Sequence, residues 1–129
     1  MQQPHAVCET HAFRRSATEA GMTPEEVARL KRVLSESPDA GDLIVGTGGA
    51  RKLRFAPTGR GKSGGYRVVT YYGGDDIPVF LMDVYAKGDK TNLSAAERVE
   101  LKKELELFAE EYRAGVRTRV MELRTGGAS

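Results

Sequence analysis

The chain has 129 residues, of which 40% are hydrophobic and 29% are charged, as expected for one globular domain. A chain of this length can bury a core without disulfides or a metal. Its single cysteine, Cys8, cannot form an internal disulfide and fits a reducing compartment. No apolar run approaches the roughly 18 residues that a membrane span needs, and the first ten residues lack a signal-peptide pattern. We therefore expect a cytoplasmic protein.

The positive charge is concentrated in one segment, although the formal net charge is only +2. Residues 43–74 contain no acidic residue, and the rest of the chain is net acidic. A local excess of cations indicates a polyanionic partner, and the many glycines of this segment argue against an inert solvated face. The cations of the segment are Arg51, Lys52, Arg54, Arg60, Lys62 and Arg67.

Two helices are predicted near the N-terminus. The first covers about residues 11–20 and ends at Gly21. The second begins at a capping box formed by Thr23 and Glu26, and it ends before Pro38. The short connection between them favours two antiparallel helices.

A strand with two different faces is predicted next, over residues 51–55. Leu53 and Phe55 alternate with Lys52 and Arg54. The strand therefore has one face for the core and one cationic face.

Two further strands are predicted later in the chain. Residues 66–72 are β-branched and aromatic, and residues 77–86 are apolar on both faces, which is typical of a central strand. The two form a hairpin. Residues 56–65 are a glycine-rich loop, and a short first strand near residues 5–8 is compatible with the sequence.

The last predicted element is a helix over residues 95–112, with Ser94 and Glu97 as its capping box. We therefore predict a single domain over residues 1–112 and a basic tail over residues 113–129, in which 116–123 forms either a short strand or a loose arm. The fold class is α+β, with helices packed on a small, mainly antiparallel sheet. The apolar stripe of the last helix consists of Leu101, Leu105, Phe108 and Tyr112.

Several kinds of site are absent from the sequence. No Cys/His cluster has zinc spacing, and no group of acids resembles a two-metal site. Residues 59–63 lack the first glycine of a nucleotide-binding loop, and a strand follows them instead of a helix. Cys8, near two histidines, is expected to be a half-buried thiol and not a nucleophile.

The remaining candidates suit phosphodiester cleavage of RNA without a metal or cofactor. The 2′-hydroxyl attacks the neighbouring phosphate, cations stabilise the added negative charge, and a lysine crowded by arginines can transfer a proton. A tyrosine can stack on a base or donate a proton. Taken alone, the residues leave catalysis and simple phosphate binding equally open. The side chains that would converge if the strands pair are Lys52, Arg54, Arg67, Tyr85 and Lys87.

Three segments resemble the RelE/HigB toxin family of the RelE/ParE superfamily: residues 41–54, 59–68 and 84–94, within a match of about residues 10–112. The resemblance implies the toxin of a type II toxin–antitoxin pair, which enters the ribosomal A site and cuts mRNA there without a metal. It also implies a twisted, mainly antiparallel sheet with two N-terminal helices on one face.

The resemblance further implies roles for single residues. Lys52 and Arg54 would act in proton transfer and phosphate binding, Arg67 would steady the scissile phosphate, and Lys87 would add a basic group after the last strand. A base-stacking tyrosine would be Tyr85 or Tyr112, although the apolar stripe favours core packing for the latter. The expected RNA contacts are Arg51, Arg60, Lys62 and Tyr85.

The expected partners are mRNA, the ribosome and an antitoxin whose acidic segment covers Lys52, Arg54 and Arg67. Three alternatives stay open at this point. The same fold serves toxins that poison DNA gyrase. A non-catalytic RNA-binding module would keep the basic patch, and an inactive toxin would persist only as a partner for its antitoxin.

Overall fold

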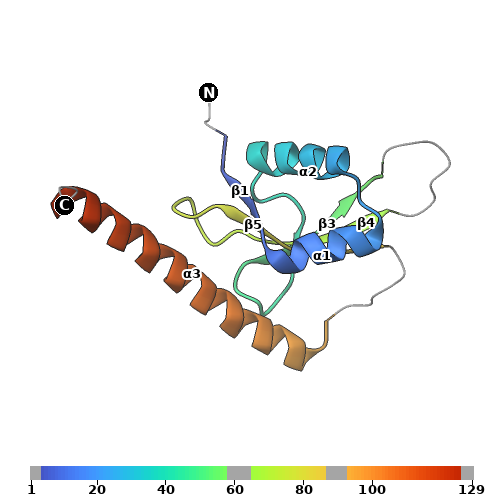
Figure 1. Ribbon diagram of the computed structural model, residues 1–129. Coiled ribbons are helices and arrows are strands. Elements are labelled where there is room, and N and C mark those ends of the chain that lie inside the picture. Colours follow the sequence, from blue (N-terminus) through green and yellow to red (C-terminus); the bar gives the residue numbers. More distant parts are fainter. Residues whose placement is uncertain (1–3, 58–64, 87–92, 126–129) are drawn as a thin grey trace.

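The computed structural model describes residues 4–57, 65–86 and 93–125, with side chains described up to residue 116. The elements form a sheet with helices on both of its faces (Figure 1). In chain order they are β1 (Val7–Glu9), α1 (His11–Ala20), α2 (Pro24–Glu36), β2 (Asp42–Leu43), β3 (Ala50–Phe55), β4 (Tyr66–Tyr71), β5 (Val79–Ala86) and α3 (Ala95–Thr125).

The five strands lie in the order β1-β5-β4-β3-β2, and only the β1–β5 pair is parallel. The predicted α+β fold with a mainly antiparallel sheet is therefore confirmed. The predicted hairpin is β4–β5, which contains a bulge between Val69 and Thr70 that the sequence did not indicate. The two-residue strand β2 was also not predicted, because it lies in a glycine-rich stretch.

The two N-terminal helices begin and end where the sequence indicates. Thr10 caps α1 by accepting a hydrogen bond from the Phe13 amide, and Gly21 ends the helix with a φ of 78°. The reciprocal capping box of Thr23 and Glu26 is present at the start of α2. The Thr10 hydroxyl also donates to the Leu81 carbonyl at 2.8 Å, which fixes α1 to β5.

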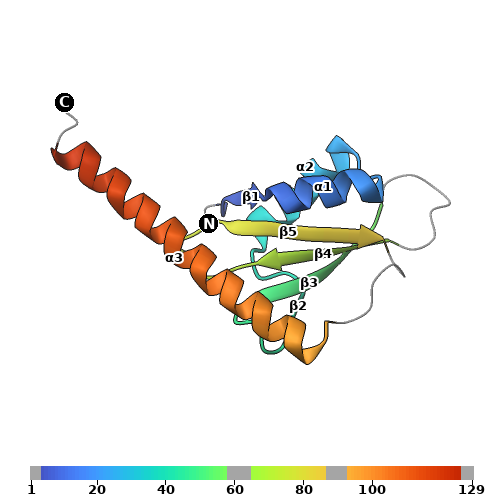
Figure 2. The ribbon, with the colours of Figure 1, turned by 60° about the horizontal axis from the view of Figure 1, so that its bottom comes forward.

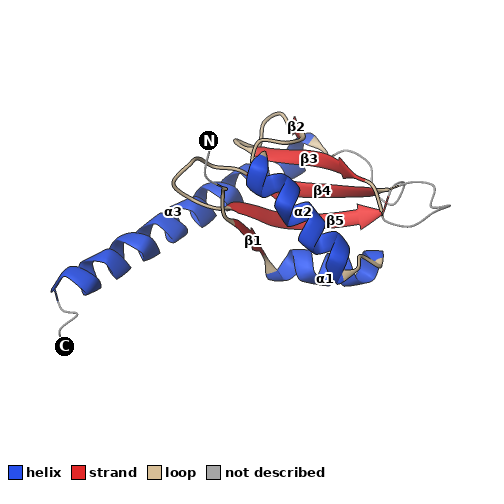
Figure 3. Ribbon diagram, turned by 90° about the horizontal axis from the view of Figure 1, so that it is seen from above, coloured by secondary structure: helices blue, strands red, loops and turns tan. Residues whose placement is uncertain are grey.

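One face of the sheet, the α1/α2 face, packs against the two N-terminal helices. In Figure 3, α2 lies across this face while α1 runs along the β5 side of the sheet. The buried Glu26 carboxylate accepts a hydrogen bond from the Tyr66 hydroxyl at 3.0 Å, so this core contains one satisfied charge. The core consists of Phe13, Ala17, Met22, Leu30, Leu34, Phe55, Tyr66, Val68, Val79, Leu81 and Val84.

The opposite face, the α3 face, is covered by α3 at one end only (Figure 2). Phe80 packs edge-on against Phe108 and Tyr112, with ring centroids 4.5 and 5.7 Å apart. Arg113 then forms two hydrogen bonds to Asp76, of 2.6 and 2.9 Å, which attach α3 to the β4–β5 turn. Among the described residues, no helix lies over the other ends of β3, β4 and β5 on this face.

The C-terminal helix is longer than predicted. α3 continues to Thr125, so neither the short strand nor the loose arm expected over residues 116–123 is present. Gly115 lies within the helix, where one glycine costs only about 1 kcal/mol. α3 crosses the predicted domain boundary at residue 112 without a break.

None of the helices in the described residues has a stretch both long and apolar enough to cross a membrane.

Candidate active site

The registers of β3, β4 and β5 bring three predicted site residues into one row across the sheet. Arg54 lies opposite Arg67, and Arg67 lies opposite Tyr85. Directly opposite residues have Cβ atoms about 4.5–5.5 Å apart. We call Arg54, Arg67 and Tyr85 the arginine row.

The arginine row belongs to the α3 face. Side chains alternate along a strand, and the neighbours Phe55, Val68 and Val84 all point into the core of the α1/α2 face. The row lies at the end of the sheet that α3 does not cross (Figure 2), where Arg54 is exposed and Arg67 and Tyr85 are half-buried.

A second row lies one step closer to α3. Lys52 lies opposite Val69, which lies opposite Asp83. Lys52 is therefore on the same face as Arg54, two residues away along β3. The structure thus places Lys52, Arg54, Arg67 and Tyr85 together, as the sequence analysis expected.

The two arginines of the row are an unfavourable pair for the sheet. Like charges directly opposite each other on neighbouring strands are destabilising, by about 0.2–1 kcal/mol. Within the part of the chain that the structure describes, neither the Arg54 nor the Arg67 guanidinium forms an ion pair or a hydrogen bond. An uncompensated pair of this kind is the arrangement that a phosphate group would neutralise.

Tyr85 is held in its neutral form. Burial raises the pKa of its hydroxyl, the nearby Asp83 carboxylate raises it further, and Arg67 partly opposes both. At neutral pH the Tyr85 hydroxyl can therefore donate a proton or a hydrogen bond to an anion at the row.

Asp83 is a member of the site that the sequence analysis missed. Its carboxylate accepts hydrogen bonds from the Ser16 hydroxyl of α1, at 2.6 Å, and from the Val84 amide, at 2.9 Å. It is the only charged residue in 77–86, and this signal within an otherwise apolar strand could have identified it.

Other predicted residues lie elsewhere. Arg51 shares the orientation of Leu53, on the α1/α2 side of β3, and its guanidinium donates to the carbonyls of Asp39 and Gly41 at 2.9 and 3.2 Å. The structure does not bring Arg51 to the arginine row, and its RNA contact stays a prediction. Lys87, Arg60 and Lys62 lie outside the described residues.

Two residues that were weighed as reactive groups pack in the core. Tyr112 contacts Phe80 under α3, which favours packing over base stacking. Cys8 is half-buried against the same cluster, as expected for an unreactive thiol. Among the described residues, no three His, Cys, Asp or Glu side chains are placed to hold a metal ion together.

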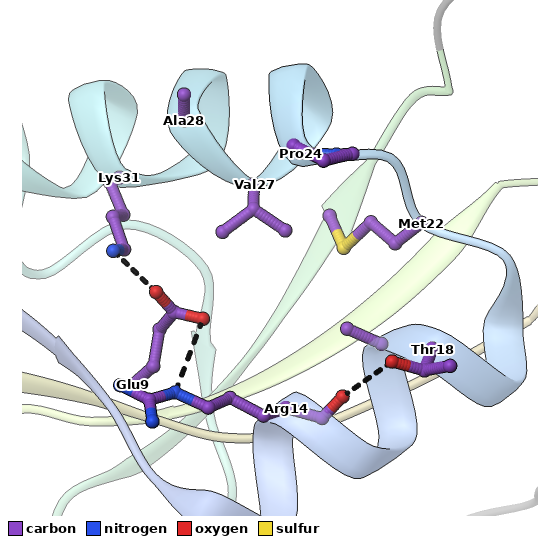
Figure 4. A pocket seen from close by; sticks show the side chains of 9 residues that line it. Glu9, Arg14, Thr18, Met22, Pro24, Val27, Ala28 and Lys31 are labelled. Carbon is purple, nitrogen blue, oxygen red and sulfur yellow. Dashed lines mark hydrogen bonds and ion pairs between the residues drawn. The ribbon is translucent and has the colours of Figure 1, made fainter.

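A separate cavity, of about 410 Å³, lies between α1 and α2, away from the arginine row (Figure 4). Its apolar wall includes Met22 and Val27, and its charged end is Glu9, which pairs with Lys31 at 2.5 Å and approaches Arg14 at 3.9 Å. One carboxylate faces two cations here, so Glu9 neutralises only part of their charge. The arginine row differs from this cavity because, among the described residues, no carboxylate pairs with its two guanidinium groups.

A comparison with protein families identifies a family that matches this chain. Residues 6–127 match the model of the RelE toxin of the RelE / RelB toxin–antitoxin system, which covers nearly the whole chain. The match includes all three strands that carry the arginine row and the whole of α3. The chain therefore belongs to the RelE toxin family.

Proposed function

We propose that this toxin is an endoribonuclease that cuts mRNA on the translating ribosome and so inhibits translation in the cytoplasm. The observation that carries the proposal is the arginine row, in which two guanidinium groups without a partner among the described residues lie beside a neutral tyrosine, at the end of the sheet that α3 does not cross. Such a group of side chains fits a phosphodiester better than any other ligand class.

The chemistry follows from these positions. The 2′-hydroxyl of the RNA attacks the adjacent phosphorus and its proton passes to a base. The bond from phosphorus to the 5′-oxygen of the next nucleotide breaks, and an acid delivers a proton to that oxygen. Arg54 and Arg67 stabilise the negative charge of the pentacoordinate phosphorus. Lys52, in the next row, and Tyr85 are the candidates for proton transfer. The products are a 2′,3′-cyclic phosphate and a 5′-hydroxyl.

The openness of the site supports a substrate presented by a large assembly. Within the described residues Arg54 is exposed and Arg67 and Tyr85 are only half-buried, so the row lies at a surface. Orientation of the reacting groups contributes much of a catalytic rate, and here a second body would have to supply it. The ribosome, which holds mRNA in a fixed conformation, can do so.

The test is induction of the toxin in cells, with growth and transcript ends as readouts. We expect the wild type to stop growth and to leave cuts inside reading frames. Loss of one group that stabilises the transition-state charge typically costs about 10²–10³-fold in rate, so Arg67→Ala and Lys52→Ala should leave transcripts intact. Arg32→Ala, which removes an exposed cation of α2, is the matched control and should behave as the wild type.

Other outcomes would contradict the proposal in distinct ways. Growth arrest with intact transcripts would indicate a gyrase poison or another target. No toxicity would indicate a binding module or an inactive toxin. If Lys52→Arg cleaves as well as the wild type, then Lys52 only binds phosphate, since an arginine keeps the charge but cannot serve as a base.

Binding to ribosomes should depend strongly on salt. Each phosphate contact releases counterions, and a protein with 6–10 such contacts loses roughly 10³–10⁵-fold in affinity between about 50 and 200 mM salt. Sedimentation with purified ribosomes over this range measures the effect, and salt-independent binding would be evidence against an RNA contact through the cationic segment.

A further inference from the structure

A groove of about 670 Å³ borders the arginine row on the α3 face. It is enclosed by α1, by β4 and β5, and by the first turns of α3. Its apolar floor includes Val69, Met82, Leu93 and Leu101, all of which are only partly buried. Val69 is two residues from Arg67 on the same strand face, so the groove and the row form one continuous surface.

The charge of this groove is opposite to that of the row. Glu97, Glu100 and Glu104 line it from α3 and Asp83 lines it from β5, whereas Arg15 is its only cation among the described residues. Glu100 and Glu104 are exposed, and neither forms an ion pair or a side-chain hydrogen bond within the described part of the chain.

Two cations of α3 lie away from the groove. Arg98 and Lys102 lie on the other flank, against the turn at residues 46–48. Glu100 and Glu104 are one helical turn apart, and like charges at this spacing destabilise a helix. The pair of Glu100 and Glu104 therefore does not itself stabilise α3.

We propose that this groove is a docking site for a segment of the antitoxin that carries lysine or arginine next to apolar side chains. The apolar side chains would enter the floor at Met82 and Leu101, and the cations would pair with Glu100 and Glu104. RNA is disfavoured here because the carboxylates repel its phosphates. The inference rests on the family assignment and does not depend on mRNA cleavage.

The groove and the row together define the charge pattern of the bound antitoxin. A chain that lies across both surfaces must be basic and apolar in the groove and acidic over Arg54 and Arg67. Complementarity of this kind favours one register of binding over others.

The test uses the purified antitoxin encoded by the reading frame next to the toxin gene. Its affinity is measured by calorimetry for toxins that all carry Arg67→Ala, so that cells tolerate them. We expect Glu100→Gln together with Glu104→Gln to weaken binding by about tenfold, since each lost charge pair is modest. Glu110→Gln with Glu111→Gln, farther along α3, is the matched control and should bind unchanged. Thermal unfolding verifies that all variants are folded.

Two results would overturn the inference. Equal affinity of the groove variant and the control would remove the groove from the antitoxin interface. Weaker binding of the groove variant to ribosomes, with antitoxin binding unchanged, would assign the groove to a ribosomal protein. Neither result bears on cleavage, which the Arg67→Ala and Lys52→Ala comparison in cells tests separately.

Discussion

The two faces of the same sheet differ in how completely they are covered. The α1/α2 face is closed along the length of β5, and its residues, such as Val68 and Leu81, are fully buried. Among the described residues, the α3 face is closed where α3 crosses it, at Tyr71 and Phe80. Beyond that point it carries both half-buried apolar side chains, such as Val69, and the charged side chains of the arginine row. One strand thus supports a core on one side and a site on the other.

The two faces show how the fold keeps a stable core next to a candidate site that contains two opposed positive charges. Alternation along β4 places Val68 in the core and Arg67 in the arginine row. Adjacent residues of the strand therefore contribute to different parts of the molecule, one to the packed core and one to the candidate site. The unfavourable Arg54–Arg67 pair is tolerated because the opposite side of the same strands is fully packed.

The largest expected effect distinguishes the two faces at adjacent positions of β5. Leu81→Ala should lower the free energy of unfolding by about 2–5 kcal/mol, because it leaves a cavity in a closed core. Met82→Ala should cost only about 1 kcal/mol, because this side chain lines the open groove and is half-buried. Urea unfolding of both variants measures the difference, and equal losses would show that the α3 face is as closed as the other.

A smaller effect of opposite sign is expected within the arginine row. Arg54→Gln removes one of two opposed charges and should stabilise the protein by about 0.2–1 kcal/mol while it lowers RNA cleavage. Unfolding and cleavage are measured on the same preparation. A variant that is less stable than the wild type would mean that the two guanidinium groups do not repel each other in the folded protein.

The smallest effect concerns the attachment of α3. The hydrogen bond from Arg113 lowers the pKa of the Asp76 carboxyl below its ordinary value of 3.8. Its contribution to stability is therefore complete above that value and is lost as the pH falls through the lowered pKa. Asp76→Asn should unfold slightly more easily than the wild type at neutral pH and equally easily in strong acid. A constant difference over this range would contradict the pairing.

The helix ends and the central strands could be predicted because local signals determine them. The capping box at Thr23 and the glycine at position 21 mark helix boundaries through hydrogen bonds to nearby residues. The alternation in β3 correctly placed Lys52 and Arg54 on one face. The family match covers the same elements and confirms the resemblance that they carry.

The remaining features depend on contacts between distant parts of the chain. The parallel pairing of β1 with β5, the bulge near Val69 and the Ser16–Asp83 hydrogen bond join residues that are far apart in sequence. The length of α3 was underestimated because the apolar stripe that predicted the helix ends at Tyr112, whereas the helix continues to Thr125. Convergence of the arginine row required the strand registers, which the sequence does not specify.

The parallel β1–β5 pair also determines when the sheet can form during synthesis of the chain. Val7 to Glu9 can pair only after Val79 to Leu81 exists, and Tyr85 follows a few residues later. A nascent chain therefore cannot close the sheet or complete the arginine row until β5 has left the exit tunnel. An incompletely translated chain lacks this row, so premature termination before β5 yields a fragment without the proposed activity.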